Sequence, residues 1–229
     1  GLATYAVKDD FITAACCMSK PETIFFAYKN HQDILKYIKQ RKISSIAVGP
    51  GLVESIKTRE FILKIISSIE LPMVLDASGL ASFAGAAGLL KKAKAKLILT
   101  PHEGEFSKLV KIPISQIRQD SKRLALEFAK ENNLILVLKR HNTIVTDGKS
   151  AYINDSGTPA MASAGSGDVL SGIISAFCSI DSNLFEAAKF SVWLHGLGGQ
   201  LAQKEKGFGI MASDISENLP NAILKFVKI

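Results

Sequence analysis

Apolar residues in this chain recur with two different periods. Short runs rich in β-branched residues predict strands, and a segment of helix length lies between most of them. Such alternation favours a mainly parallel sheet with helices on both faces, so the pattern predicts an α/β fold. The predicted strands are Leu2–Val7, Thr23–Tyr28, Ser45–Val48, Met73–Asp76, Leu97–Leu99, Leu134–Lys139, Thr143–Thr146 and Ala151–Asn154.

The clearest predicted helix is Glu54–Ile69. Its residues Ile62, Ile65, Ile66 and Ile69 fall on one helical face, and most charged side chains lie off that face. After the last predicted strand the pattern changes to helix alone. Three further helices are predicted there, over Ser166–Ser179, Leu184–Lys204 and Ser213–Val227.

Length and composition narrow the class of protein. A chain of 229 residues can bury one large core, and no linker interrupts the pattern, so we expect a single domain over residues 1–229. Apolar residues make up 47% and charged residues 21%, which excludes a disordered or fibrous chain. No stretch is suited to spanning a membrane, so we expect no membrane partner.

The formal net charge is +7, and the basic residues are scattered along the chain. This excess suits an anionic ligand, although a solvated lysine-rich surface is the simpler explanation. The basic and aromatic signature of RNA binding is absent, so we expect no nucleic-acid partner.

Three cysteines, Cys16, Cys17 and Cys178, form neither an even disulfide framework nor a metal-site spacing. They favour a reducing, cytoplasmic compartment. The first residue is Gly1 rather than Met, and the apolar start is too short and uncharged for a secretory signal. We therefore expect that the natural polypeptide is longer.

Ligands of parallel α/β sheets bind at the carboxyl ends of the strands, where glycine-bearing loops bring backbone N–H groups close to them. That rule selects the loops in which chemistry is expected. Four of them stand out: Gly49–Leu52, Asp76–Leu80, Thr100–Glu105 and Gly157–Asp168.

The loop before a long apolar helix carries the strongest signal. In AGSGDVLSGIISAF, from Ala164 to Phe177, two glycines and Ser166 come just before the helix, and Asp168 lies in its first turn. Exposed N–H groups at a helix start form an anion site suited to a phosphate in transfer. An ionised Asp168 could accept a proton from a substrate hydroxyl. Alternatively, Asp168 only stabilises the helix start.

Two other loops carry weaker candidates. Lys139 ends the strand LILVLK and Thr143 follows it, so an ammonium group and a hydroxyl could bind nucleotide phosphates, or could form only a polar hairpin turn. In TPHEGEF, capping accounts for Pro101 at the first helical position and for Glu105. His102 is left as a ligand contact or an ordinary surface histidine.

The remaining candidates are structural. The range Gly49–Leu52 predicts a tight turn, since it has neither a dinucleotide fingerprint nor a Walker lysine. Asp76 ends a strand at the same edge, where it could cap the next segment or hold a ligand hydroxyl. His31, His141 and His195 have no chemical partner nearby in sequence. HExxH and GxSxG are absent, so a protease or esterase is not supported.

Taken in this order, the loops resemble the ribokinase-like superfamily, and more closely its NAD(P)H-hydrate dehydratase family. The motif TPHxGE distinguishes that family best from sugar kinases. The resemblance covers nearly the whole chain, through VGPGL (Val48–Leu52), VLDASGL (Val74–Leu80), LTPHEGEF (Leu99–Phe106), VLKRHNT (Val137–Thr143), GTPAMASAGSGDVLSGI (Gly157–Ile173) and WLHGLGGQLA (Trp193–Ala202).

The resemblance implies a ribokinase-like three-layer α/β/α domain that uses ADP or ATP, with Mg²⁺, to dehydrate hydrated NADH or NADPH. Phosphoryl transfer to the ring hydroxyl would precede elimination. Homo-oligomers are expected. The resemblance implies that Asp168 is the catalytic base and that the anion hole is formed by Gly165, Ser166 and Gly167. The implied nucleotide contacts are Lys139, Arg140, His141, Asn142, Thr143 and Gly167. The implied substrate contacts are Gly51, His102 and Asp168, and the metal ligands are unassigned.

The chain departs from the family in ways that bear on nucleotide preference. Where the family usually has Lys-Gly-Ala before the threonine, the range Lys139–Asn142 reads Lys-Arg-His-Asn, and Thr158 replaces a common Asn. The family's N-terminal glycine-bearing strand and helix are missing, and some members carry an epimerase domain before them. A vitamin-precursor kinase of the same superfamily and a nucleotide-binding module without turnover are the alternatives.

Overall fold

The computed structural model describes residues 2–8 and 22–226. The chain divides into two compact units, Gly1–Ile43 and Ser44–Ile229. The single domain expected over residues 1–229 stays a prediction. Cys16 and Cys17 lie outside the described residues.

The first unit contains a small parallel sheet and one helix. Strands β1 (Thr4–Val7) and β2 (Ile24–Ala27) pair in parallel, as two of the predicted strands. Helix α2 (His31–Arg41) begins after Asn30, whose side chain accepts hydrogen bonds from the N–H groups of the first turn. Tyr37 of this helix stacks on Phe26 of β2, with ring centroids 4.2 Å apart.

The second unit is built on a six-stranded sheet of order β3-β4-β5-β6-β7-β8. The first four strands are parallel, and β7 and β8 are antiparallel to their neighbours. The mainly parallel sheet predicted from the sequence is confirmed. The strands are β3 (Ile46–Val48), β4 (Pro72–Leu75), β5 (Lys96–Leu99), β6 (Ile135–Leu138), β7 (Ile144–Thr146) and β8 (Ala151–Ile153).

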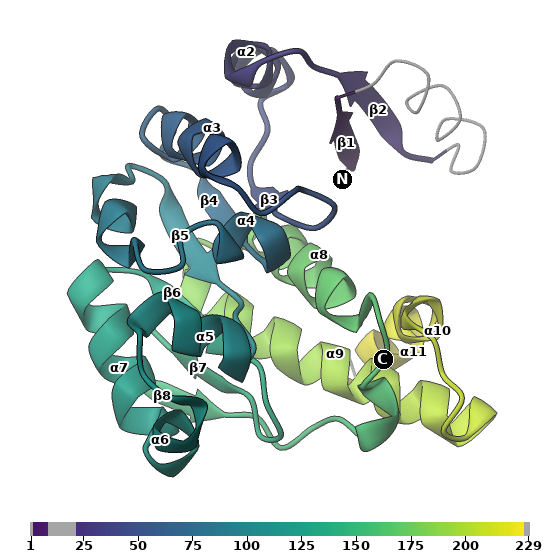
Figure 1. Cartoon of the computed structure of the whole chain (residues 1–229). Coiled ribbons are helices and arrows are strands. Elements are labelled where there is room, and N and C mark those ends of the chain that lie inside the picture. The colour runs from purple at the N-terminus through teal and green to yellow at the C-terminus, as the bar shows by residue number, and fades with distance from the viewer. Residues whose placement is uncertain (1, 9–21, 227–229) are drawn as a thin grey trace. The chain divides into compact units, whose positions relative to one another are not determined.

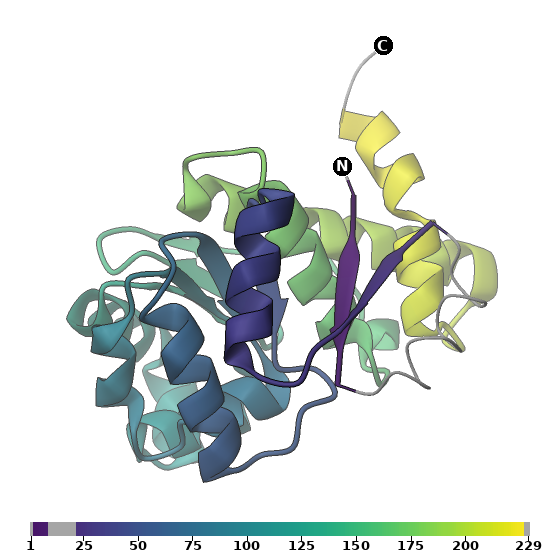
Figure 2. The same ribbon diagram turned by 90° about the horizontal axis from the view of Figure 1, so that it is seen from above.

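Helices cover both faces of this sheet, in three layers (Figure 1). One face carries α3 (Ile56–Ile66), α4 (Ala77–Ala81), η1 (Ala87–Lys92), α5 (Glu103–Val110), α6 (Ile114–Gln119) and α7 (Ser121–Asn132). The other carries α8 (Ser166–Cys178) and α9 (Leu184–Lys206), which pack side by side (Figure 2). A short η2 (Pro159–Met161) precedes α8.

The core between the sheet and α8 and α9 fixes where α8 begins. Apolar side chains on the inner face of the strands pack against one face of each helix, and burying each such side chain stabilises the fold by about 1.5–3 kcal/mol. This cluster joins Val74, Ile98, Val137 and Val145 of four neighbouring strands to Leu170, Ile174 and Cys178 of α8 and to Ala187, Ala188 and Val192 of α9.

One predicted helix is wrong in extent. The range Ser213–Val227 forms two helices, α10 (Ala212–Glu217) and α11 (Leu219–Phe226), and Val227 lies outside the described residues. The break falls at Asn218, whose side chain donates to the carbonyl oxygen of Asp214 at 3.1 Å. Pro220 lacks an N–H group and cannot continue the preceding helix, but it fits the first turn of a new one.

Candidate active site

The loops that follow β4, β5 and β6 meet at one edge of the sheet. Asp76 directly follows β4, and Lys139 directly follows β6. The backbone N–H of Lys139 donates to the carbonyl oxygen of Pro101 at 2.7 Å, and His102 pairs with Lys139 in a parallel bridge. This extension of the sheet brings Asp76, His102 and Lys139 to the same edge, as expected for residues at the carboxyl ends of parallel strands.

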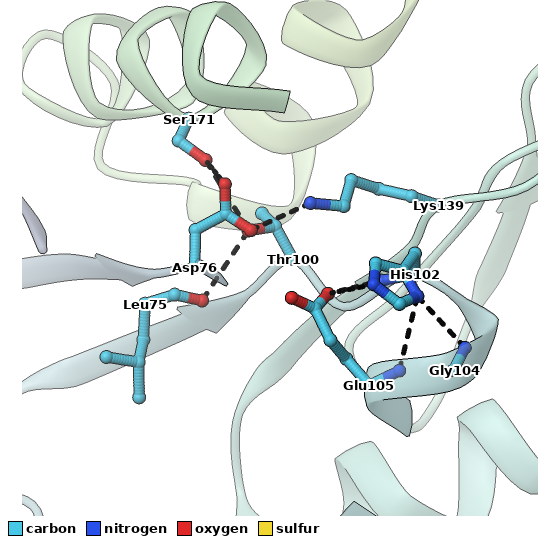
Figure 3. Close-up of polar contacts among 8 residues, drawn as sticks. All are labelled: Leu75, Asp76, Thr100, His102, Gly104, Glu105, Lys139 and Ser171. Atoms are coloured by element: carbon cyan, nitrogen blue, oxygen red, sulfur yellow. Dashed lines mark hydrogen bonds and ion pairs between the residues drawn. The ribbon is translucent and has the colours of Figure 1, made fainter. Parts of the chain in front are cut away.

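Asp76 is the buried centre of this edge, with 1% of its surface exposed. Its Oδ1 accepts a hydrogen bond from Lys139 Nζ at 2.7 Å, and its Oδ2 accepts one from Ser171 Oγ at 2.7 Å (Figure 3). Removing one partner of such a buried pair typically costs about 3–5 kcal/mol. Asp76 occupies the N-cap position of α4, as one of the two predicted roles has it, but its side chain makes no capping hydrogen bond to that helix.

The helix start beside this pair has glycine at two points. Gly165 is the N-cap of α8 with φ 85°, a left-handed conformation that a side chain strains. A Cβ on Gly167 would lie 3.2 Å from Lys139 Nζ and 3.8 Å from Asp76 Oδ2. Within the described residues, the N–H groups of Gly167 and Asp168 make no hydrogen bond. Two amides and an ammonium group therefore share one anion-binding mouth.

Asp168 lies exposed at that mouth, in the first turn of α8. Partial burial and the negative charge of Asp76 raise its pKa, and the positive charge of Lys139 lowers it. A carboxylate with a raised pKa is a better proton acceptor, provided that it stays ionised at the working pH. The arrangement suits a base next to a phosphoryl group.

The loop after β6, Lys139–Thr143, does not place all its side chains together. Lys139 reaches Gly167, but Arg140 hydrogen-bonds to Ser121 at the start of α7. Thr143 Oγ1 donates to the carbonyl oxygen of Arg140 at 3.1 Å, which holds the loop closed on itself. His141 and Asn142 are exposed. The nucleotide contacts assigned to this loop stay predictions.

His102 is placed differently from the expectation. Pro101 is not the first helical residue, because α5 begins at Glu103 and His102 itself is the N-cap. His102 Nδ1 accepts hydrogen bonds from the N–H groups of Gly104 at 3.0 Å and Glu105 at 3.2 Å, and the backbone N–H of His102 donates to Glu105 Oε2 at 2.8 Å (Figure 3). Because Nδ1 accepts, the ring proton lies on Nε2 of this largely exposed side chain.

Gly51 belongs to the turn after β3, as expected. The N–H of Leu52 donates to the carbonyl oxygen of Gly49 at 3.0 Å, and Gly51 has φ 76° with open space around it. Gly49 must be glycine, since a Cβ there would lie 1.8 Å from the carbonyl oxygen of Asp76. Contact of Gly51 with a substrate stays a prediction.

Two residues of the site were missed from the sequence. Ser171 follows Asp168 by one helical turn, so helical spacing alone could have found it. His195 of α9 has Nε2 3.3 Å from Ser166 Oγ. Burial lowers the pKa of His195 to about 4, which keeps the ring neutral. His195 belongs to the motif WLHGLGGQLA, but that motif indicated no role for the histidine.

The donor set for a metal is sparse. Among residues 2–8 and 22–226, no group of three or more His, Cys, Asp and Glu side chains could hold a metal ion. Both carboxylate oxygens of Asp76 are engaged by protein donors, whereas Asp168 is exposed at the mouth. This fits Mg²⁺ held mainly by nucleotide phosphates and water, since Mg²⁺ often takes only one or two protein carboxylates.

No helix in the described part of the chain has the length and apolar character needed to cross a membrane.

Comparison with known proteins gives a consistent result. The model of the family described as NAD(P)H-hydrate dehydratase matches residues 1–221. The bifunctional NAD(P)H-hydrate repair enzyme Nnr of Thermofilum pendens is 37% identical over 199 residues, which are 86% of this chain and 38% of that protein. The chain thus spans well under half of this relative.

Solved structures share the fold. The ADP/ATP-dependent NAD(P)H-hydrate dehydratase of Bacillus subtilis, crystallised with ATP and Mg²⁺ and soaked with CoA, has a TM-score of 0.82 at 24% identity, covering 99% of this chain and 83% of that one. A ribokinase-like superfamily protein of Enterococcus faecalis has a TM-score of 0.81 at 23% identity, covering 100% and 78%. The fold is therefore ribokinase-like.

Proposed function

Because this chain belongs to the NAD(P)H-hydrate dehydratase family, we propose that it dehydrates hydrated NADH or NADPH in a reaction that consumes ADP or ATP. The observation that carries the proposal is the mouth of α8. There the ammonium of Lys139, the Asp168 carboxylate and the amides of Gly167 and Asp168, which have no hydrogen-bond partner in the described part of the chain, converge. That combination binds a phosphoryl group and accepts a proton beside it.

In the first step, the hydroxyl oxygen of the hydrate attacks the terminal phosphorus of the nucleotide. Asp168 takes the hydroxyl proton, and the bond from phosphorus to the bridging oxygen breaks, which releases AMP from ADP or ADP from ATP. The helix amides and Lys139 stabilise the charge on the transferred group. Positioning and charge stabilisation of this kind supply most of the catalysis in phosphoryl transfer.

In the second step, the carbon–oxygen bond of the phosphate ester breaks and inorganic phosphate leaves with the bonding electrons. The neighbouring ring carbon gives up a proton to water, and the electrons of its C–H bond form the ring double bond of NADH or NADPH. The first step therefore converts hydroxide, a poor leaving group, into phosphate. Mg²⁺ bound with the nucleotide would neutralise part of the phosphate charge.

Other residues of the edge fit supporting roles. Asp76 holds the Lys139 ammonium next to Gly167 through the 2.7 Å ion pair. His102 presents Nε2–H from the start of α5, where it could donate to a polar group of the hydrate. The open turn at Gly51 lets a substrate approach the backbone.

The test is an assay of the full-length protein with hydrated NADH, Mg²⁺ and either ADP or ATP. We expect the reduced nicotinamide absorbance to return, and Asp168→Asn to lower kcat by about 10³-fold while nucleotide affinity changes little. Glu131→Gln, an exposed acid far from the mouth, is the matched control and should behave as the wild type.

Two outcomes would contradict the proposal. Phosphorylation of a vitamin-precursor alcohol without recovery of the absorbance would indicate a small-molecule kinase. Nucleotide binding without either reaction would indicate a binding module.

A further inference from the structure

We propose that His195 is a positioning residue of this site, whose ring fixes the Ser166 hydroxyl so that it donates a hydrogen bond to the transferred phosphoryl group. The inference rests on the proposed function of the α8 mouth. It assigns roles to a buried histidine and a buried serine that contact one another from two different helices.

The geometry places the pair directly under the anion site. Ser166 is the first residue of α8, between Gly165 at φ 85° and Gly167, and it is 8% exposed. His195 lies within α9 and is also 8% exposed. The two helices pack side by side (Figures 1 and 2), which brings His195 Nε2 to 3.3 Å from Ser166 Oγ.

The protonation state of His195 decides which group donates. Burial lowers the pKa of the ring to about 4; a hydrogen bond with the backbone of Ser166 opposes this, and the charge of Lys139 lowers the pKa further. The imidazole is therefore neutral and carries one N–H. We place this N–H on Nε2, from which it donates to Ser166 Oγ, 3.3 Å away.

The serine proton is then free for a ligand. With His195 Nε2–H donating to Oγ, the Ser166 hydroxyl keeps its own proton for another acceptor. Among the described residues, Ser166 Oγ makes no hydrogen bond other than the one to His195. A partly buried hydroxyl next to the amides of Gly167 and Asp168 has one natural acceptor, an oxygen of the phosphoryl group they bind.

A purely structural histidine would behave differently. His195 lies next to Gly196, where α9 comes close to the loop before α8, since a Cβ on Gly196 would lie 2.1 Å from Ser156 Oγ. If packing were its whole role, His195→Leu would lower stability, and the remaining folded enzyme would keep its kcat. Stability and kcat must therefore be measured together.

The experiment is a double-mutant cycle with Ser166→Ala, His195→Leu and both, plus His195→Gln, whose amide can replace Nε2–H. We expect each single variant to lower kcat by about 10- to 100-fold, with the KM for nucleotide changed far less. The double variant should be no slower than the slower single variant, because both remove one hydrogen bond. His195→Gln should recover most of the rate.

Additive losses in the double variant, or full kcat in His195→Leu, would overturn the inference. If the wild-type protein does not dehydrate the hydrate, the proposed function fails separately. The same cycle is then measured on ATP·Mg²⁺ affinity by calorimetry. Coupled losses of affinity would support the role of His195, and independent losses would overturn it.

Discussion

The two ends of the parallel strands in the six-stranded sheet differ in how their charged side chains are paired. At the carboxyl edge, the buried Asp76 and the partly buried Lys139 form an ion pair, and Ser171 donates a further hydrogen bond to Asp76. At the opposite edge lies a hollow of about 500 Å³ where β5 and β6 begin, and its charged side chains are Lys91, Lys94, Lys96, Glu131, Asp147 and Lys149.

Among the charges of the hollow, Asp147 bonds only to the local chain within the described residues. Asp147 accepts hydrogen bonds from the N–H groups of Lys149 at 2.8 Å and Ser150 at 2.7 Å, as in an ordinary turn. Buried charges cost free energy unless their partners are fixed, so their presence at the carboxyl edge marks function better than volume does.

The largest effect is expected from breaking the buried pair. Lys139→Met should lower kcat by about 100-fold or more, because it removes a charge that stabilises the transferred group. It should also lower the free energy of unfolding by about 3–5 kcal/mol, since Asp76 is left buried and unpaired.

Adding Asp76→Asn to Lys139→Met separates the two roles. The second change removes the orphaned charge, so the unfolding free energy should recover in part while activity stays low. Urea titration and initial rates measure both. A double variant no more stable than Lys139→Met would show that the pair is not strongly coupled.

Two glycines in left-handed conformations, one at each end of the sheet, allow the effects of substitution on stability and on rate to be compared. Gly165→Ala, at φ 85°, should cost about 1–2 kcal/mol and lower the rate by about 10-fold through displacement of the anion site. Gly148→Ala, at φ 82°, should destabilise more, because its Cβ would lie 2.4 Å from the backbone nitrogen of Lys130. The rate per folded Gly148→Ala molecule should be unchanged, as thermal unfolding and active-site titration would reveal.

A smaller effect is expected on the pH profile. The base must be ionised, so kcat/KM should fall as the pH drops through the raised pKa of Asp168. Asp76→Asn removes a negative charge that raises this pKa, and the acid limb of its residual activity should move to lower pH. A move to higher pH would mean that the loss of Lys139 positioning outweighs the loss of the Asp76 charge.

The smallest effect belongs to the opposite edge. Lys94→Glu reverses an exposed charge at the hollow and should change kcat/KM by less than about 2-fold, since exposed charges are strongly screened by salt. Steady-state kinetics at two salt concentrations would check this. A loss comparable to that of Lys139→Met would place ligand binding at the wrong edge.

Local signals in the sequence predicted much of the fold and part of the site. The strands, the mainly parallel sheet and the start of α8 follow from short-range periodicity and glycine spacing. The meeting of Asp76, His102 and Lys139 at one edge follows from the topology of parallel strands.

The hydrogen-bond partners of the side chains in the site could not be predicted from these local signals. Ser171 and Asp76 are 95 residues apart, and Ser166 and His195 are 29 apart, so the first contact depends on how α8 packs on the sheet and the second on how α8 packs against α9. Helix α5 begins two residues later than expected from Pro101, because the ring nitrogen of His102 accepts the capping hydrogen bonds that a Ser, Thr, Asp or Asn side chain usually accepts. The two long-range contacts are set by tertiary packing, whereas the His102 cap is a local contact.

The most direct test of the central claim follows the hydroxyl oxygen of the substrate. NADH hydrated with a heavy oxygen isotope is turned over with ATP and Mg²⁺ by the full-length protein, and the inorganic phosphate is analysed by mass spectrometry. If the phosphoryl group meets the alcohol at the mouth of α8, each phosphate carries one labelled oxygen. Unlabelled phosphate, with the isotope recovered in water, would contradict the account.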